Sequence, residues 1–224
     1  MENLAHLTRQ LDILPPEHLD TPITVVGAGA IGSMLVWGLA KSGFRQMSVY
    51  DFDKIDVENM SCSLYRPKDI GRPKVDALAE IVREFADVKI YEFNERFTKN
   101  MNPESGIVVA AVDSMTARKL LWEIHKNHDK TLLFIDPRMS AESGSIFALN
   151  PCDPAAAADY EATLYKDEDA VQERCTEKST TYTSMMLPGQ VVNTIKSFLT
   201  KREPYAKVMH WSIRHNDMFV IKSA

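Results

Sequence analysis

Residues 23–53, ITVVGAGAIGSMLVWGLAKSGFRQMSVYDFD, predict a strand, a tight glycine turn, a helix and a second strand in that order. The first strand, Ile23–Val26, is a short β-branched run between a proline and a glycine, as is typical of a buried parallel strand. The second strand, Gln46–Tyr50, ends directly before Asp51. This order of elements is the beginning of a nucleotide-binding α/β domain.

Three glycines follow the first strand with the spacing G-x-G-x-x-G. Gly27 allows the bend, Gly29 lets a phosphate approach the backbone, and Gly32 lets the helix pack closely on the strand. The phosphate then meets a helix N-terminus, whose unpaired N–H groups and dipole favour an anion. Asp51 follows about twenty positions later, where an acidic residue can accept hydrogen bonds from ribose hydroxyls. The sequence therefore predicts a nucleotide site.

The composition, with 45% apolar and 25% charged residues, is that of an ordinary globular protein. Lys and Arg number 26 against 31 Asp and Glu, a net charge of -5 without a basic block, which argues against a nucleic-acid partner. The first residues show no signal-peptide pattern and no run of 18 apolar residues occurs, so we expect a cytoplasmic protein without a membrane segment. Its cysteines, Cys62, Cys152 and Cys175, form no C-x-x-C pair, so we expect no disulfide framework and no structural zinc.

The rest of the chain alternates between helical and strand patterns. Helical spacing predicts helices at residues 1–20, 73–86, 114–125 and 182–199. Apolar runs predict strands at residues 88–93, 107–112, 132–135 and 145–149, and a final hairpin at residues 208–221 turning near Asn216 and Asp217.

This alternation predicts a Rossmann-like α/β fold, with a mostly parallel doubly wound sheet, helices on both faces and a C-terminal hairpin. We expect residues 1–224 to form a single domain, with an N-terminal helix arm over residues 1–20 and a mobile crossover loop over residues 151–182. Ligands of such sheets bind beyond the carboxyl ends of the strands, where Gly27, Asp51 and Asp113 are expected to meet.

The loop after the second strand carries a resemblance to a known family. Residues 51–78, DFDKIDVENMSCSLYRPKDIGRPKVDAL, resemble the ThiF/MoeB/HesA family of ATP-dependent activating enzymes, which are related to ubiquitin-activating enzymes. The order of features is also similar across nearly the whole chain. It runs from Arg9-Gln10 through the glycine turn, Asp51-x-Asp53, Asn59 and Gly-x-Pro-Lys74 to a strand that ends in Asp113.

The resemblance implies an enzyme that uses ATP and Mg²⁺ to adenylate a C-terminal carboxylate. The implied partner is a small ubiquitin-like or sulfur-carrier protein ending in Gly-Gly, or a peptide. The resemblance also implies a role for each matching residue. Gly27, Gly29, Ala30 and Gly32 would shape the ATP pocket, and Asp51 and Asp53 would lie at the ribose. Asn59 and Lys74 would contact phosphates, and Asp113 would bind magnesium. Arg9 resembles the arginine that the other subunit of a homodimer offers to the phosphates. Both the attacking carboxylate and the α-phosphate are negatively charged and repel each other. The reaction therefore needs cations and N–H donors that neutralise this charge.

The sequence departs from the family pattern after Asn59. Cys62 stands where the family has an arginine and Ser63 where it has a glutamine, so one phosphate clamp is missing. Arg66 could substitute from another direction. In the resembling family a cysteine near Cys175 can take the activated carrier as a thioester or join it through sulfur, although Cys175 is as well explained as a small packed residue at a helix start.

Two other functions stay open. A nucleotide-binding scaffold that has lost the chemistry is suggested by the missing arginine at Cys62. An NAD-dependent oxidoreductase is compatible with the glycine turn and Asp51 alone. It gives Asn59, Lys74 and Asp113 no evident task, so we rank it last.

Overall fold

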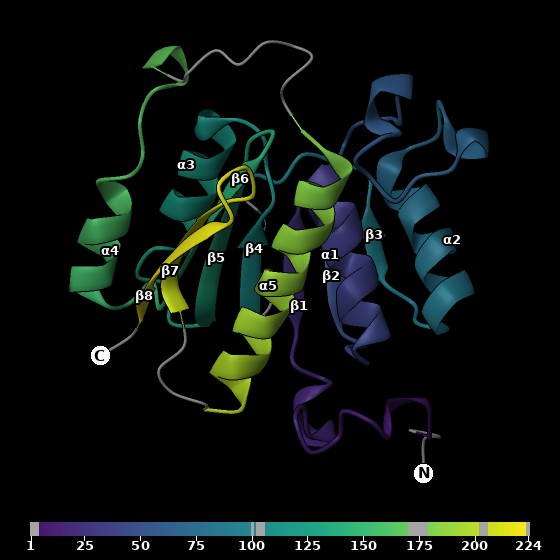
Figure 1. Ribbon diagram of the computed structural model, residues 1–224, viewed down its shortest axis with the longest axis horizontal. Helices are drawn as coiled ribbons and strands as arrows, with labels where there is room; N and C mark the ends of the chain where they lie inside the picture. The colour runs from purple at the N-terminus through teal and green to yellow at the C-terminus, as the bar shows by residue number, and fades with distance from the viewer. Residues whose placement is uncertain (1–4, 100, 102–105, 170–178, 202–205, 223–224) are drawn as a thin grey trace.

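One sheet organises the computed structural model, which describes residues 5–99, 101, 106–169, 179–201 and 206–222. Its strand order is β3-β2-β1-β4-β5-β6-β7-β8 (Figure 1). The first five strands of this order are parallel: β3 (Tyr91–Phe93), β2 (Met47–Tyr50), β1 (Ile23–Val26), β4 (Gly106–Ala110) and β5 (Thr131–Met139). The remaining strands pair antiparallel: β6 (Ser143–Leu149), β7 (Ala206–Ser212) and β8 (Asp217–Lys222).

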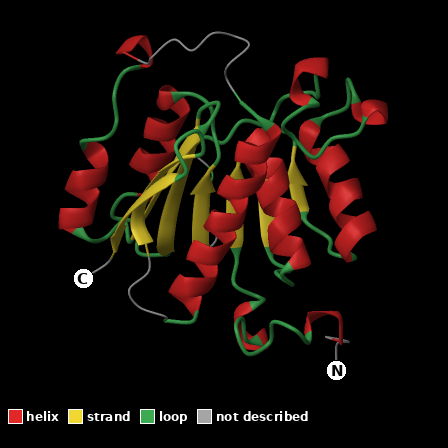
Figure 2. Cartoon of the chain, in the orientation of Figure 1, coloured by secondary structure: helices red, strands yellow, loops and turns green. Residues whose placement is uncertain are grey.

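Helices cover both faces of the sheet, which confirms the predicted fold class. Helices α1 (Ala30–Lys41), α2 (Lys74–Ala86) and α5 (Thr181–Leu199) share one apolar core with β1, β4 and β5. Helices α3 (Met115–His125) and α4 (Pro154–Glu161) share a second core with the opposite face of the same strands. Figure 2 shows the strands passing behind α1 and α5, and the final hairpin predicted from the sequence is β7–β8.

The strand register places several loops at one edge of the sheet. Val26, the last residue of β1, pairs with Tyr50 of β2 on one side and with Ala110 of β4 on the other. All three strands are parallel, so the residues that follow them meet at the carboxyl edge. The glycine turn, Asp51 and the segment leading to Asp113 are those residues.

The N-terminal segment is not the helix expected for residues 1–20. Its described part has only two single 3₁₀ turns, at Ala5–Leu7 and Pro16–His18. The apolar side chains of Leu7 and Leu19 both pack against Gly43, after α1, rather than forming one helical stripe. Burial of single side chains against this loop therefore takes precedence over helix formation.

The predicted crossover loop also contains more regular structure than expected. Helix α4 begins after Asp153, whose carboxylate accepts hydrogen bonds from the N–H groups of Ala155 and Ala156. Its sequence, PAAAADYE, has no apolar period, so the helix depends on this cap and on the burial of Tyr160. Residues 170–178 lie outside the described part of the chain.

The other predicted elements agree with the structure apart from their ends. Strand β3 begins at Tyr91 instead of residue 88, and Pro188 lies inside α5. Among the described residues, no helix is both long and apolar enough to span a bilayer.

Candidate nucleotide site

The glycine turn has the geometry that its spacing predicts. Gly27 has a φ of 99°, and a Cβ atom there would lie 2.2 Å from the Ala111 carbonyl oxygen at the end of β4. A Cβ on Gly32 would lie 1.9 Å from the Gly27 carbonyl oxygen, so the helix contacts the turn directly. At Gly29, the residue before α1, a Cβ would meet no atom within 4 Å. The turn is therefore closed against β4 and α1 but open at Gly29, as a phosphate cradle requires.

Asp51 binds the back of this turn. Its Oδ2 atom accepts a hydrogen bond from the Ala28 N–H at 2.7 Å, and its Oδ1 atom accepts one from the Asp53 N–H at 2.8 Å. Burial raises the pKa of Asp51, while the Ala28 N–H group and the charge of Lys74 act in the opposite direction. Each carboxylate oxygen keeps a second lone pair that could accept a hydrogen bond from a ribose hydroxyl.

Lys74 is the first residue of α2 and contacts the carboxylates of the D-x-D motif. Its Nζ atom lies 2.8 Å from Oδ2 of Asp53 and 4.0 Å from Oδ2 of Asp51. The side chain of Lys74 is only 11% exposed, which is unusual for a lysine unless it is paired. The structure thus brings Lys74 to Asp51 and Asp53, which precede it by more than 20 residues, beside the glycine turn.

The loop between Asn59 and Tyr65 supports the turn through contacts that the sequence does not reveal. The buried Tyr65 hydroxyl donates a hydrogen bond to the Ala28 carbonyl oxygen at 2.5 Å. Burial raises the pKa of Tyr65, so the hydroxyl keeps its proton and remains a donor. The Leu64 N–H also donates to Oγ of Ser33 in α1, at 3.2 Å. A tyrosine six positions after an asparagine is no recognisable motif, so only the fold shows this function.

Asn59 is oriented by its own 3₁₀ turn. Its Oδ1 atom accepts a hydrogen bond from the Asp56 N–H at 3.0 Å, which leaves the amide nitrogen as the group that could donate to a phosphate. The Ser63 hydroxyl donates to the Asn59 carbonyl oxygen, and Cys62 beside it is buried, with 7% exposed. The loop therefore presents no cation at the position where the family has arginine.

Arg66 does not fill that gap, because acidic residues engage its whole guanidinium group. Its Nε, Nη1 and Nη2 atoms donate to Asp69, Glu84 and Glu80 at 2.8, 2.8 and 2.7 Å. The hydrogen bond with Asp69 raises the pKa of Arg66 further above its usual value, so the charge is permanent. These contacts hold the 3₁₀ turn at Pro67–Asp69 to α2. The charge of Arg66 is thus already paired with carboxylates and is not available to a phosphate.

Asp113 lies two residues beyond Ala111, which forms the wall of the glycine turn. It is exposed, and its carboxylate makes no hydrogen bond or ion pair with any residue that the structure describes. Ser114 caps α3, with its Oγ accepting a hydrogen bond from the Ala117 N–H at 3.2 Å. Carboxylate oxygen is the ligand type that Mg²⁺ prefers, so Asp113 and the open cradle at Gly29 fit a magnesium nucleotide.

Ala30 is the first residue of α1 and follows Gly29 directly in the glycine turn. Arg9 is exposed on the N-terminal segment, and this segment lies beyond the amino ends of the strands (Figure 1). Cys175 lies outside the described residues. No group of three His, Cys, Asp or Glu side chains suited to a metal occurs within the described ranges.

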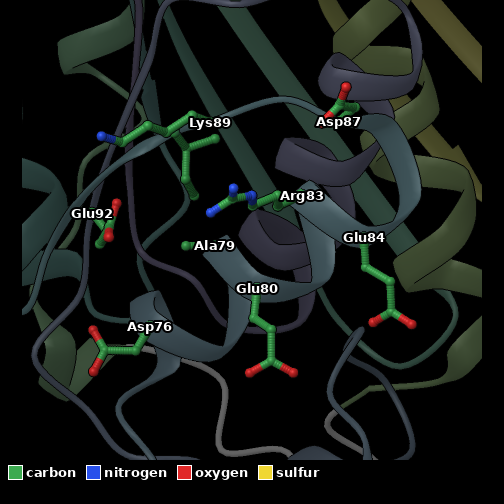
Figure 3. Close-up of a pocket in the computed structure, with 9 residues that line it drawn as sticks. Asp76, Ala79, Glu80, Arg83, Glu84, Asp87, Lys89 and Glu92 are labelled. Atoms are coloured by element: carbon green, nitrogen blue, oxygen red, sulfur yellow. The ribbon is translucent and has the colours of Figure 1, made fainter.

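A hollow of about 620 Å³ on the outer side of α2 and β3 has the wrong charge for a nucleotide (Figure 3). Acidic side chains predominate around it: Asp76, Glu80, Glu84, Asp87 and Glu92 against Arg83 and Lys89. A triphosphate is repelled by such a surface, so this hollow does not suit a nucleotide.

Comparison with known proteins shows the family of this chain. The family model described as the ThiF family matches residues 17–223. The chain belongs to the ThiF family. Two curated relatives of this ThiF-family chain act on small modifiers by name. The NEDD8-activating enzyme E1 catalytic subunit of Arabidopsis thaliana is 36% identical over 110 residues, which are 44% of this chain and 23% of the relative. Ubiquitin-like modifier-activating enzyme 5 of Caenorhabditis briggsae is 24% identical over 217 residues, 86% of this chain and 48% of the relative. The chain thus spans less than half the length of these relatives.

Solved structures show the same fold. E. coli MccB with ATP superimposes with a TM-score of 0.73 at 12% identity, over 98% of this chain and 72% of MccB. MccB has also been solved with AMPCPP and MccA.

Proposed function

We propose that this ThiF-family protein is an ATP-dependent adenylyltransferase that activates the C-terminal carboxylate of a small ubiquitin-like or sulfur-carrier protein ending in Gly-Gly, or of a peptide. The observation that carries the proposal is the meeting of the open glycine cradle, Asp51, Lys74 and Asp113 at one edge of the sheet. The names of the relatives, which activate NEDD8 and ubiquitin-like modifiers, support the substrate class. We extend the proposal to a homodimer in the cytoplasm and to residues 1–224 as one adenylation domain.

The proposed reaction forms a bond between a carboxylate oxygen and the α-phosphorus of ATP and breaks the bond from that phosphorus to the bridging oxygen of pyrophosphate. The N–H groups of the glycine turn and the N-terminus of α1 hold the phosphates. Asp51 accepts hydrogen bonds from the ribose, and Asn59 and Lys74 donate to phosphate oxygens. Asp113 would hold a magnesium ion, which would supply positive charge to offset that of the triphosphate.

Lys74 has a defined task in this scheme. In the structure it neutralises Asp53 at 2.8 Å, and a phosphate that enters the cradle competes with Asp53 for the ammonium group. Negative charge that builds up during the attack is thereby met by a cation that is already nearby and largely shielded from water.

ATP–pyrophosphate exchange tests the proposal. We expect labelled pyrophosphate to enter ATP only when a carrier protein or peptide with a free C-terminus is present, and a carrier ending in an amide serves as the control. Exchange that is equal with both carriers, or AMP release without any carrier, would contradict an acyl-adenylate.

The second candidate is a nucleotide-binding scaffold without chemistry. It is favoured by the buried Cys62 at the arginine position and by the engagement of Arg66 with three carboxylates. Tight ATP binding with no exchange for any carrier would select it. The NAD-dependent oxidoreductase remains the third reading, and titration with NAD against ATP distinguishes it from the other two.

A further inference from the structure

A buried ionic cluster lies beside the end of β4, next to the candidate site. Asp136 in β5 is fully buried and accepts hydrogen bonds from Nε of Arg118 at 2.6 Å, Nε of Arg138 at 2.8 Å and the Tyr160 hydroxyl at 2.9 Å. The register of β4 and β5 pairs Val109 with Ile135, so Asp136 lies level with the last residue of β4. Nothing in the motifs of the nucleotide site assigns a role to this cluster.

The two arginines make different second contacts. Arg138 donates to the carbonyl oxygen and hydroxyl of Thr163, at 3.0 and 2.9 Å, and so fastens the chain after α4. Arg118 instead donates from Nη2 to the carbonyl oxygen of Val112 at 2.9 Å. Val112 is the residue immediately before Asp113.

The backbone is therefore held on both sides of Asp113. On one side Arg118 binds the Val112 carbonyl, and on the other Ser114 caps α3 while its own carbonyl oxygen accepts a hydrogen bond from the Arg118 N–H at 3.1 Å. Between these anchors the carboxylate of Asp113 is exposed and makes no hydrogen bond or ion pair with the described residues. A fixed backbone that carries a free carboxylate is the arrangement of a preorganised ligand.

Neutralising Asp136 does not by itself explain Arg118. Arg138 and Tyr160 already give that carboxylate a cation and a hydroxyl donor. A second guanidinium group, with 6% of its side chain exposed, adds positive charge to a buried place, which is costly unless it serves another contact. That contact is the Val112 carbonyl oxygen.

We propose that Arg118, anchored by Asp136, is a positioning residue that fixes the Val112–Asp113 backbone and so sets the affinity of the nucleotide site for Mg²⁺. The inference rests on the proposed role of Asp113 as a metal ligand, but it does not require that the protein adenylates anything.

The test compares Arg118→Lys with Arg138→Lys in the full chain. Both variants keep the positive charge at the substituted position, but lysine at position 118 cannot span Asp136 and Val112 together. Binding of ATP is titrated with MgCl₂ and again with EDTA, and AMP, which needs no metal, is the reference ligand. We expect Arg118→Lys to raise the Mg²⁺ concentration needed for half-maximal ATP binding by about tenfold, as is usual for groups behind a metal ligand, with AMP affinity unchanged within about twofold. Arg138→Lys should leave both values unchanged.

Hydrogen exchange supplies a readout that does not depend on any ligand. The Met115 amide donates to Oδ1 of Asp167 at 2.6 Å and directly follows the segment that Arg118 holds. It should exchange faster in Arg118→Lys than in the wild type and should be unaffected in Arg138→Lys. If Arg118→Lys does not fold, Asp136→Asn removes the charge that anchors Arg118 and should raise the Mg²⁺ requirement in the same direction. Three results would overturn the inference. The first is an equal shift of the Mg²⁺ requirement in Arg118→Lys and Arg138→Lys, and the second is no shift in a folded Arg118→Lys or Asp136→Asn. The third is ATP binding by the wild type that does not depend on the metal. Failure of pyrophosphate exchange alone would instead contradict adenylation and leave this test intact.

Discussion

Asp113 is the residue whose proposed role is most specific, because its exposed carboxylate has no other task among the described residues. We expect Asp113→Asn to abolish the Mg²⁺ dependence of ATP binding while AMP binds as before, since only the triphosphate needs a metal to offset its charge. Calorimetric titration with each nucleotide, with and without MgCl₂, measures this directly. If the magnesium requirement of the variant equals that of the wild type, Asp113 is not the ligand.

His125 makes a different residue-scale prediction, on stability against pH. Its ring is buried, Nδ1 lies 3.0 Å from Oγ1 of Thr131, and burial lowers the pKa of His125 to about 4, with the nearby His128 acting in the same direction. The unfolded chain takes up this proton below about pH 6.5, whereas the folded chain does so only near pH 4. The contribution of neutral His125 is therefore complete above pH 6.5 and is lost as the pH falls toward 4, at about 1.4 kcal/mol per pH unit and about 3 kcal/mol in total.

Replacement by a side chain that does not titrate tests this sign. We expect His125→Gln, whose amide can still bond Thr131, to flatten the fall in the urea midpoint between about pH 6.5 and 4.5 relative to the wild type. Carboxylates elsewhere contribute equally to both proteins and cancel in the difference. Parallel curves for the two proteins would show that His125 is not the titrating group.

Among single elements, the glycine turn contains one glycine that is needed for stability and another that is needed for ATP binding. A methyl group at Gly32 would overlap the Gly27 carbonyl oxygen, so Gly32→Ala should destabilise the protein by about 1–3 kcal/mol. A methyl group at Gly29 meets no atom within 4 Å, so Gly29→Ala should keep or slightly raise Tm while weakening ATP binding about tenfold or more. Thermal melts and ATP titration of both variants check this, and equal losses of Tm would contradict the open cradle.

Elements with a strong local signal could be predicted from the sequence, and those held by tertiary contacts could not. The glycine turn, the buried strands and α2 follow from spacing and apolar period, so β1, β2 and the turn lie where residues 23–53 place them. Helix α4 has no apolar period and depends on the Asp153 cap. The N-terminal segment has a helical apolar pattern, yet Leu7 and Leu19 pack against the loop at Gly43.

The same division applies within the site. The positions of Gly27, Asp51, Lys74 and Asp113 could be predicted from motif order because each has a fixed place relative to a strand or helix end. Tyr65 and the Arg118–Asp136 pair could not be found in this way, since their function depends on which loops the fold brings together. The acidic partners of Arg66 lie in α2, which explains why sequence proximity to the missing clamp was misleading.

At the scale of the whole molecule, the position of Arg9 decides whether it could contact ATP bound to its own chain or only ATP bound to a second copy. The segment that carries Arg9 is fastened to the loop after α1, where the Gln10 amide donates to the Ser42 carbonyl oxygen at 2.7 Å and Leu7 packs on Gly43. The glycine turn lies at the other end of α1, a helix of 12 residues and so about 18 Å long. Figure 1 shows the N-terminal segment and the start of α1 at opposite ends of the strands. A phosphate role for Arg9 therefore requires a second copy of the chain.

Mixing two impaired variants tests that requirement. We expect Arg9→Ala to reduce ATP turnover without loss of folding, and Asp113→Asn to be inactive. In a mixed homodimer in which Arg9 acts across the interface, the site on the Arg9→Ala chain receives an intact Arg9 from the Asp113→Asn chain and keeps its own Asp113. Random pairing of equal amounts should then restore about a quarter of wild-type exchange activity, because half of the dimers are mixed and each has one complete site. If Arg9 acted within its own chain, neither site of the mixed dimer would be complete and activity would stay at the level of the parents. Light scattering fixes the oligomeric state, and a monomer with full activity would exclude Arg9 from the site altogether.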